Sequence, residues 1–437
     1  MFSITQNYLS RGFWGDEAWT SLISQLPYLQ MLKTTAADFH PPGYYSIVEV
    51  VYKFLPPTEI VTRSISIVFY LLTIFLVYKL ASYVRGRLFG ILSAIVVAVN
   101  PIFFAYAFEA RNYTMFAFAA TGSIYCLVKL SQKFTKVNAL GFVLFSTLGI
   151  YTHYYMFFIL AAQSLHILLF DRKIFWKVTG LYLIVAILYL PWLPFLASQI
   201  KSVGESYWIG AIDRRTHFEA ILRILGGEYK TSLRPFLFNL SIGLLIIGLI
   251  QHALRHKFEK PYLLIWLWAT VPFILATLPG LKIDGLRLPF RPIFFWRYLI
   301  GSAVPLSMVI LHASEKLPKY LFAISTAAVI LLSISIDAMT FMRNPYTFRQ
   351  AYQNNILPKI SSEDKIVTVL PSFAEVTYYK NRFGLKNDLT VLPEGLVQSS
   401  GKSLLDSYVE NGDVTIEEAP SGSYFELRPG PSVQRME

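Results

Sequence analysis

The residues best suited to chemistry are the adjacent carboxylates of Asp16 and Glu17, which stand between Trp14 and Trp19 near the start of the chain. A carboxylate can take the proton from a hydroxyl or an amine as that group attacks a substrate. Acidic residues also stabilise the N-terminus of a helix, so the pair alone is an ordinary structural feature. No long apolar run precedes it, and we expect both residues in a loop or a surface helix.

A second candidate lies in residues 40–45, where two prolines, a glycine and two tyrosines follow His40. The prolines restrict the backbone and prevent a helix from extending backwards past them. Such a rigid turn can hold His40 and Tyr44 towards a binding site. It can equally serve only as the entry to a helix at the membrane surface. The residues alone do not separate these two interpretations.

Charged residues also follow directly on an apolar stretch, at Glu109 and Arg111, with Tyr113 close behind. Ionisable side chains at such a boundary either extend to water or line a polar cavity. The planar guanidinium of Arg111 suits a phosphate, because it can donate two parallel hydrogen bonds. These three residues are therefore candidates for contacts to a substrate.

Two further aromatic-rich segments contain His153 and the pair Arg297 and Tyr298. A lone histidine is more often a hydrogen-bonded residue than a metal ligand, and no His-x-x-x-His or Asp-x-Asp spacing accompanies His153. We therefore name no metal ligand and leave open whether a divalent metal serves as cofactor. Arg297 and Tyr298 begin an apolar stretch, where an arginine either extends to the interface or binds a lipid phosphate.

The composition identifies the elements that must position these residues. Of the 437 residues, 54% are hydrophobic and only 15% are charged, whereas a soluble domain has about 25% charged residues. Apolar runs of about 20 residues, enough to cross about 30 Å of hydrocarbon, indicate a multi-span membrane protein. The net charge of +12 would suggest a nucleic-acid partner in a soluble chain, but these cations lie in short loops, and we expect none. The single cysteine, Cys126, excludes an internal disulfide.

Ten spans are predicted, and the charges of their loops set the orientation. The spans cover about residues 62–83, 88–107, 112–130, 138–152, 156–170, 174–197, 233–254, 261–279, 293–313 and 318–341. Every second connection carries clustered cations, at Lys79, Arg85 and Arg87, at Lys129, Lys133 and Lys136, at Arg172, Lys173 and Lys177, at Arg255, Lys257 and Lys260, and at Lys316 and Lys319. By the positive-inside rule these five loops are cytoplasmic, and the alternate connections are external.

The remaining segments divide the chain into three predicted parts. Residues 1–61 form an external N-terminal segment, in which residues 44–55 are expected to form an interfacial helix. Residues 62–341 form the transmembrane helical domain. Its long external loop, residues 198–232, contains an amphipathic helix over 216–225 capped by Asp213 or Thr216. Residues 342–437 form a small external α/β domain.

The pattern of the C-terminal part predicts its elements. Strands are expected over 365–370, 389–392, 414–417 and 424–428, helices over 373–382 and 402–410, and a loose tail from residue 429. The parity of the spans puts this part on the external side. The chemical candidates fall there too: Asp16, Glu17, His40, Glu109, Arg111, His153 and Arg297. Since the topology rests on other residues, this agreement favours one shared site.

These motifs, in this order, resemble a known family. They are Asp-Glu-Ala at 16–18, His-Pro-Pro-Gly-Tyr-Tyr at 40–45, Arg63, Gly-Arg at 86–87, Glu-Ala-Arg-Asn-Tyr at 109–113, Tyr-Thr-His-Tyr at 151–154 and Arg-Tyr at 297–298. The chain resembles the membrane glycosyltransferases of the C-type (GT-C) fold. Among them it is similar to the protein O-mannosyltransferases and aminoarabinose transferases of glycosyltransferase family 39, over about residues 10–340.

The resemblance implies a function and assigns roles. Such enzymes take a sugar from a polyprenyl phosphate at the outer face of the cell membrane and pass it to an acceptor protein, lipid or glycan. Asp16 matches the acidic catalytic position, with Glu17 supporting it. Glu109 and Arg111 would border the donor, and Arg297 would hold its phosphate. His40, Tyr44, Tyr113, His153 and Tyr298 complete the expected substrate site. A single displacement would invert the anomeric centre.

Two alternatives come from other functional classes. A lipid-carrier transporter or flippase would use the same arginines to bind a headgroup without chemistry, but its spans should carry more charges than these do. A membrane scaffold would use the α/β domain to bind a partner. Because the related enzymes begin with a span and this sequence begins almost at the first external loop, we also expect a further span upstream of Met1 in the gene.

Overall fold

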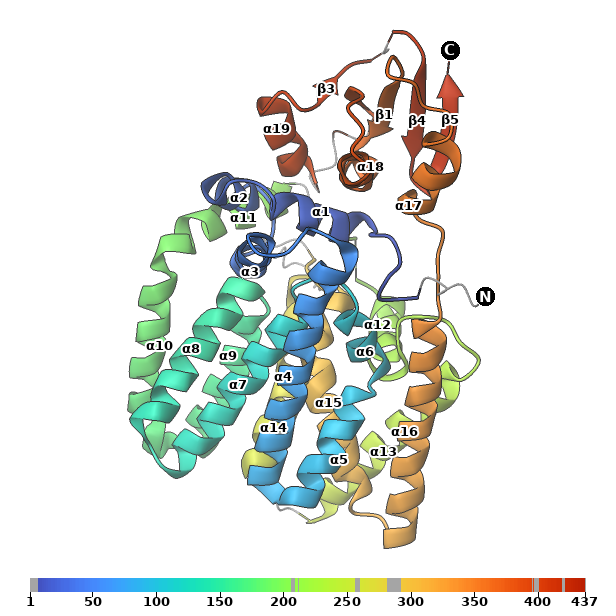
Figure 1. Cartoon of the computed structure of the whole chain (residues 1–437). Coiled ribbons are helices and arrows are strands. Elements are labelled where there is room, and N and C mark those ends of the chain that lie inside the picture. The colour runs from blue at the N-terminus through green and yellow to red at the C-terminus, as the bar shows by residue number, and fades with distance from the viewer. Residues whose placement is uncertain are drawn as a thin grey trace.

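The computed structural model describes residues 7–205, 209–210, 212–255, 260–280, 292–394, 396, 401–418 and 421–436. A bundle of helices makes up the larger part, and a small sheet with its helices lies beyond one end of the bundle (Figure 1). Three short helices from the N-terminal segment lie between these two parts. They are α1 (Gly15–Ile23), α2 (Tyr28–Ala36) and α3 (Gly43–Tyr52). The segment that contains Asp16 is thus enclosed by elements from both ends of the chain.

Apart from α12 in the long loop, the helices of the bundle fall on the predicted spans, although α11 extends past the predicted end at residue 197. They are α4 (Glu59–Arg85), α5 (Arg87–Ala98), α6 (Pro101–Ala107), α7 (Tyr113–Gln132), α8 (Lys136–Thr152), α9 (Met156–Phe170), η1 (Arg172–Ile174), α10 (Phe175–Tyr189), η2 (Leu190–Trp192), α11 (Leu193–Glu205), α12 (Arg214–Gly226), α13 (Arg234–Arg255), α14 (Lys260–Thr277), η3 (Leu278–Gly280), η4 (Trp296–Leu299), α15 (Ile300–Ser314) and α16 (Lys319–Phe341). Among the described residues, six helical stretches are long and apolar enough to cross a membrane, and the bent pair α5 and α6 makes a seventh.

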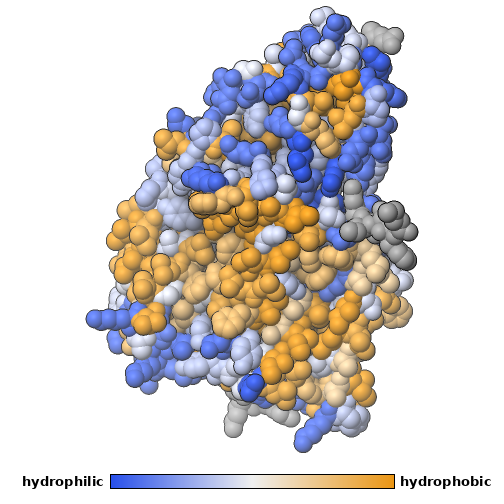
Figure 2. All heavy atoms as spheres, in the orientation of Figure 1, coloured by the Kyte–Doolittle hydropathy of each residue, from blue (hydrophilic) through white to orange (hydrophobic). Residues whose placement is uncertain are grey.

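The other predicted spans are shorter helices of the same bundle. Helices α8, α9 and α15 have 17, 15 and 15 residues, which is less than a straight crossing of the hydrocarbon core requires. On the face shown in Figure 2, apolar side chains cover the middle of the bundle, whereas hydrophilic residues prevail at its lower end and around the sheet. The chain is a multi-pass membrane protein, as its hydropathy predicts.

The bend between α5 and α6 has a local cause. The two helices meet at 67°, where Pro101 begins α6 and removes a backbone donor. Asn100 caps the new helix by accepting from the amide of Phe103 (3.1 Å) and donates to the hydroxyl of Ser307 on α15 (3.2 Å). The segment that follows α6 reaches α1, because the backbone amide of Ala110 donates to Glu17 Oε1 (2.9 Å).

Two helices expected outside the spans are present. The rigid turn after His40 opens α3, which ends before Pro56. The amphipathic piece of the long loop is α12, and Asp213 and Thr216 form a reciprocal capping box at its start. Of the preceding part of that loop, residues 206–208 and 211 lie outside the described residues, as do residues 281–291 of the later external loop.

The C-terminal part forms a five-stranded sheet with the order β3-β2-β1-β4-β5. Its elements are α17 (Phe348–Ala351), the π-helical turn η5 (Tyr352–Ile356), β1 (Lys365–Val369), α18 (Leu370–Arg382), β2 (Leu389–Leu392), α19 (Lys402–Glu410), β3 (Thr415–Ile416), β4 (Tyr424–Arg428) and β5 (Ser432–Met436). The first four strands pair in parallel, with Ile366 opposite Leu389 and Phe425. Helix α18 packs on α1 and so connects the sheet to the N-terminal segment.

The prediction of a loose tail from residue 429 is wrong. Residues 432–436 form β5, which pairs antiparallel with β4 so that Phe425 stands opposite Arg435. Gly430 turns the chain with a φ of 82°, a conformation that glycine adopts without strain. This edge strand is mostly exposed and therefore lacks the apolar alternation on which the prediction depended.

Candidate active site

Glu17 lies in a closed ion pair that anchors α1 to the bundle. Both Glu17 and Arg63 of α4 are fully buried, and Arg63 donates from Nε to Oε1 (2.8 Å) and from Nη2 to Oε2 (2.6 Å). The backbone amide of Ala110 donates to Oε1 as well (2.9 Å). Burial alone would raise the pKa of Glu17, but the charge and hydrogen bonds of Arg63 hold that pKa below its ordinary value. Glu17 is thus paired and shut off from solvent.

The remaining donors of Arg63 hold the chain just before α1. Its Nη1 donates to the carbonyl oxygens of Leu9 (2.7 Å) and Arg11 (2.6 Å), and its Nη2 donates to that of Gly12 (3.2 Å). One guanidinium therefore organises the whole approach to α1, because every one of its contacts lies on that segment or on Glu17. The position of Asp16, the next residue towards the N-terminus of α1, follows from these contacts.

Asp16 points to the other side of α1 and meets two arginines. Its side chain is 41% exposed, and Oδ2 lies 3.7 Å from Arg111 Nη2 and 3.7 Å from Arg297 Nη1. These distances exceed the 2.7–2.9 Å or so of a charge-assisted hydrogen bond. The Nε atoms of Arg111 and Arg297 are buried and have no hydrogen-bond partner among the described residues. Because the Nη contacts to Asp16 are loose, the two guanidinium groups can still donate to an anionic ligand beside this carboxylate.

Aromatic rings and a second carboxylate fix Arg297. Its guanidinium lies over the rings of Trp14 (4.9 Å) and Trp296 (5.1 Å), a favourable arrangement for a cation. Its Nη2 is 3.8 Å from Glu228 Oε1 in the segment after α12. The long loop between α11 and α13 thus contributes to the same cluster as the N-terminal segment.

His40 completes the cluster on the side of Arg111. Its Nε2 lies 3.3 Å from Arg111 Nη2, and its Nδ1 lies 2.9 Å from Asp38 Oδ2. A guanidinium can only donate, so His40 Nε2 accepts from Arg111, and His40 Nδ1 carries a proton and donates a hydrogen bond to Asp38. This assignment follows from the hydrogen-bond network. Asp38 thus orients the ring of His40.

Tyr298 and His153 form an aromatic wall next to the arginines. The His153 ring stacks on Phe116 at 5.0 Å and meets Tyr298 at 5.2 Å. Burial, together with the positive charge of the nearby Arg111, lowers the pKa of His153 to about 3. His153 is consequently neutral, and its Nδ1 accepts from the backbone amide of Tyr155 (3.1 Å).

Tyr113 and Tyr44 support Arg111 from inside the protein. The Arg111 guanidinium lies 6.0 Å from the centre of the Tyr113 ring. Tyr44 is fully buried, and its hydroxyl lies 2.8 Å from Ser66 Oγ, which in turn donates to the carbonyl of Arg111 (3.1 Å). Tyr44 thus acts on the backbone of Arg111 and does not reach the open side of the cluster.

Glu109 occupies a neighbouring buried pocket. It accepts from the Tyr8 hydroxyl (3.0 Å) and lies 3.6 Å from Arg11 Nη2. Burial raises the pKa of Glu109 to about 7, although Arg11 acts in the opposite direction. Of the predicted site residues, the structure brings Asp16, His40, Arg111 and Arg297 into one cluster with Tyr113, His153 and Tyr298 around it. It places Glu17, Tyr44 and Glu109 behind this cluster as buried supports.

Several members of the site carry no obvious signal in the sequence. Glu228 lies in a loop without a recognisable pattern, and Arg11 precedes the first motif. Glu375 comes from α18, yet its Oε1 lies 3.5 Å from where a Cβ on Gly15 would stand, at the start of α1. Helix α1 has no side-chain cap of its own. Burial raises the pKa of Glu375 to about 7, and the charge of Asp16 acts in the same direction.

An apolar cavity of about 530 Å³ adjoins the cluster at His40, His153 and Tyr298. Its remaining lining comes from the segment before α3, from α9 and α11, and from the residues that flank the later external loop: Phe39, Pro41, Tyr154, Tyr155, Phe157, Phe158, Leu196, Gln199, Ile200, Lys201, Val203, Pro279 and Ile293. A cavity with one polar end and apolar walls suits an amphiphilic ligand. Among the described residues, no group of three or more His, Cys, Asp or Glu side chains is arranged to hold a metal ion.

Comparisons with known proteins agree with this architecture. Residues 39–197 match a sequence family described as dolichyl-phosphate-mannose-protein mannosyltransferase. The structure resembles ArnT from Cupriavidus metallidurans in its apo state, with a TM-score of 0.62 at 13% identity over 96% of this chain and 89% of that chain. It resembles ArnT bound to undecaprenyl phosphate equally well, with a TM-score of 0.63 at 12% identity over 97% and 90% of the two chains.

A more distant structure shares the same fold. The oligosaccharyltransferase from Archaeoglobus fulgidus, in a complex with zinc and sulfate, matches with a TM-score of 0.53 at 14% identity over 86% of this chain and 58% of that chain. A comparison with curated proteins finds no match. The chain therefore has the GT-C fold, with a transmembrane helical bundle and a small α/β part, and the predicted resemblance is confirmed.

Proposed function

We propose that this GT-C chain is a glycosyltransferase that moves a sugar from a polyprenyl-phosphate donor to an acceptor protein, lipid or glycan at the outer face of the cell membrane. The observation that carries the proposal is the Asp16 carboxylate between the guanidinium groups of Arg111 and Arg297, at 3.7 Å from each. A carboxylate for the acceptor and two cations for a phosphate are the groups that this transfer requires. The sequence family and the GT-C fold support the same reaction class.

The donor phosphate would bind at the arginines. The Nη atoms of Arg111 and Arg297 that lie 3.7 Å from Asp16 can donate hydrogen bonds to phosphate oxygens. The polyprenyl chain would extend into the apolar cavity beyond His40 and Tyr298. Once the phosphate engages Arg297, the loose ion pair with Asp16 opens and leaves the carboxylate free to accept a proton.

Transfer would then occur in one displacement. The acceptor hydroxyl or amine attacks the anomeric carbon while its proton passes to Asp16. The bond between that carbon and the phosphate oxygen breaks, and the lipid phosphate leaves with the electron pair. Arg297 and Arg111 stabilise the charge that grows on this oxygen. Attack from the face opposite the leaving group inverts the anomeric centre, as it does in inverting glycosidases.

The test supplies labelled polyprenyl-phosphate sugars, a hexose and a pentose series, to membranes that contain the chain together with native acceptors. An enzyme releases free polyprenyl phosphate and labels an acceptor, whereas a flippase moves the intact donor without release. We expect release with at least one donor, and a loss of about 10²–10⁴-fold in rate for Asp16→Asn. Movement of intact donor without release, or equal release by Asp16→Asn, would contradict the proposal.

A further inference from the structure

A second cavity lies at the opposite end of the bundle from Asp16. Helix α7 connects the two places, because Tyr113 at its start adjoins the arginine cluster and Ser131 near its end lines this cavity. Twenty residues of helix span about 30 Å, close to the thickness of the hydrocarbon core. The cavity has a volume of about 570 Å³. It therefore belongs to the other membrane boundary and has no part in the site described above.

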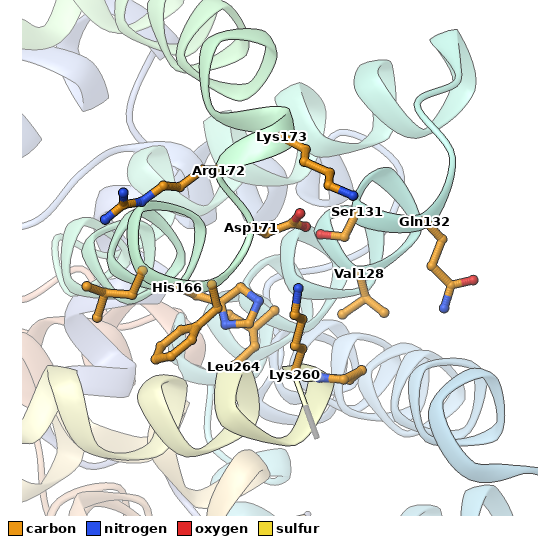
Figure 3. A pocket seen from close by; sticks show the side chains of 12 residues that line it. Val128, Ser131, Gln132, His166, Asp171, Arg172, Lys173, Lys260 and Leu264 are labelled. Carbon is orange, nitrogen blue, oxygen red and sulfur yellow. The ribbon is translucent and has the colours of Figure 1, made fainter. Parts of the chain in front are cut away.

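Cationic side chains converge on this cavity from separate elements. Figure 3 shows Lys173 and Lys260 reaching into the same space from opposite sides, with Asp171 between them. Arg172 also lines the cavity, so three cations face one carboxylate. Arg172 Nε donates to the carbonyl of Leu168 (2.8 Å), whereas neither lysine forms an ion pair with a residue that the structure describes. Among the described residues that line the cavity, cations thus outnumber carboxylates by three to one.

A buried imidazole supplies a second observation. His166 is only 3% exposed and lines the cavity, and its Nδ1 has no hydrogen-bond partner within the described part of the chain. A buried polar atom without a partner is costly, which makes a missing ligand or water the ordinary explanation. The positive-inside rule accounts for lysines near this boundary, but it does not require them to meet over a cavity that is also lined by a buried histidine with an unpartnered ring nitrogen.

The rest of the lining indicates what kind of anion fits. Val128, Leu169 and Leu264 contribute apolar surface. Trp176, close by at the start of α10, is 80% exposed, as is typical of residues at the level of the lipid headgroups. A ligand that presents a negative charge to the lysines and hydrocarbon to these walls is an amphiphile, and basic pockets between transmembrane helices are known to bind such headgroups.

We infer that this cavity binds the phosphate of an anionic membrane phospholipid, with Lys173 and Lys260 on the phosphate, His166 beside it and the acyl chains along the apolar walls. The shared chemistry of the ligand is a phosphate group, which free phosphate also provides. The lipid is favoured because the cavity combines the cations with apolar walls at the membrane boundary, and free phosphate would gain nothing from those walls.

The test measures lipid binding to the purified full chain in detergent. Short-chain phosphatidylglycerol, phosphatidylcholine of the same chain length and inorganic phosphate are titrated separately, and native mass spectrometry counts the bound molecules. The variants are Lys173→Ala, Lys260→Ala and their combination. Lys177→Ala is the matched control, because the Lys177 ammonium lies over the Phe134 ring, 5.2 Å from its centre, and the residue does not line the cavity.

We expect phosphatidylglycerol to bind more tightly than phosphatidylcholine, and the double variant to bind it at least about tenfold more weakly, since each lysine near an anionic surface contributes about 1 kcal/mol. The control should bind as the unchanged protein does. Equal affinity in the double variant would overturn the site. Inorganic phosphate that binds as tightly as phosphatidylglycerol would overturn the assignment to a lipid. Thermal unfolding without lipid checks that each variant is folded.

Discussion

Replacing Glu17 by glutamine should destabilise the protein, although Glu17 is adjacent to the proposed catalytic carboxylate. Glutamine keeps the size of the side chain but removes the charge that faces Arg63. The guanidinium would then remain fully buried with carbonyl groups as its partners and no counter-ion. Removing one member of a buried ion pair costs about 3–5 kcal/mol. We expect a decrease of this size in the free energy of unfolding of Glu17→Gln.

The pH dependence has a definite sign. Because the pKa of Glu17 is lowered in the folded protein, its pair with Arg63 contributes stability above the ordinary pKa of 4.5. That contribution is lost as the pH falls through the lowered value. The destabilisation caused by Glu17→Gln should therefore be large at neutral pH and shrink in acid.

The matched control is Asp16→Asn, which changes the neighbouring carboxylate in the same way. Asp16 is partly exposed, and its ion pairs with Arg111 and Arg297 are loose. The Asp16→Asn substitution should therefore change the free energy of unfolding by less than about 1 kcal/mol. The rate of sugar transfer by this variant should fall nonetheless. Denaturant unfolding in detergent, followed by tryptophan fluorescence, measures both variants. A Glu17→Gln protein as stable as the unchanged chain, or a larger loss in Asp16→Asn, would refute this division of roles.

Three further predictions concern the rest of the molecule. Burial raises the pKa of Glu375 to about 7, so its contribution to stability is present below the ordinary pKa of 4.5 and lost as the pH rises through 7. Glu375→Gln should therefore unfold at a higher denaturant concentration than the unchanged protein at about pH 8, but not at about pH 5. Equal unfolding midpoints at both pH values would exclude a buried carboxyl with a raised pKa. On a Cys126→Ala background, an impermeant thiol reagent on intact cells should label Ser361→Cys but not Ser131→Cys, and the reverse pattern would invert the topology. Deleting Ser432–Met436 removes five cross-strand pairs with β4 and should lower the free energy of unfolding by about 1–5 kcal/mol. An unchanged unfolding midpoint would mean that this segment is a loose tail that adds no stability.

Hydropathy and charge predicted the helical bundle well, because a bilayer requires each span to be long and apolar. Each of the ten predicted ranges contains helix, although 174–197 covers α10 and only part of α11, and 293–313 becomes helical only at Trp296. The strands β1, β2 and β4 were also recognisable, since their inner residues are apolar and buried. Strand β5 was missed because an exposed edge strand is held by backbone hydrogen bonds to β4 and needs little apolar pattern.

The site was predictable in its members but not in their arrangement. Asp16 and Glu17 are neighbours in the sequence, and successive residues of a helix point about 100° apart, so the two carboxylates face different surroundings. Which of the two is buried depends on Arg63, whose contact lies far along the chain. Glu375 could not be foreseen at all, because only the packing of α18 on α1 brings it to Gly15.

The central claim is that Arg297 holds a lipid phosphate beside a base at Asp16, and donor binding measured together with single-turnover transfer tests it most directly. The purified chain, Arg297→Ala, Arg297→Lys and Asp16→Asn are compared with the donor that proves active. We predict that Arg297→Ala weakens both binding and transfer, that Arg297→Lys recovers part because an ammonium lacks the planar fork, and that Asp16→Asn binds normally but transfers about 10²–10⁴-fold more slowly. Normal donor affinity in Arg297→Ala together with normal transfer in Asp16→Asn would contradict the account.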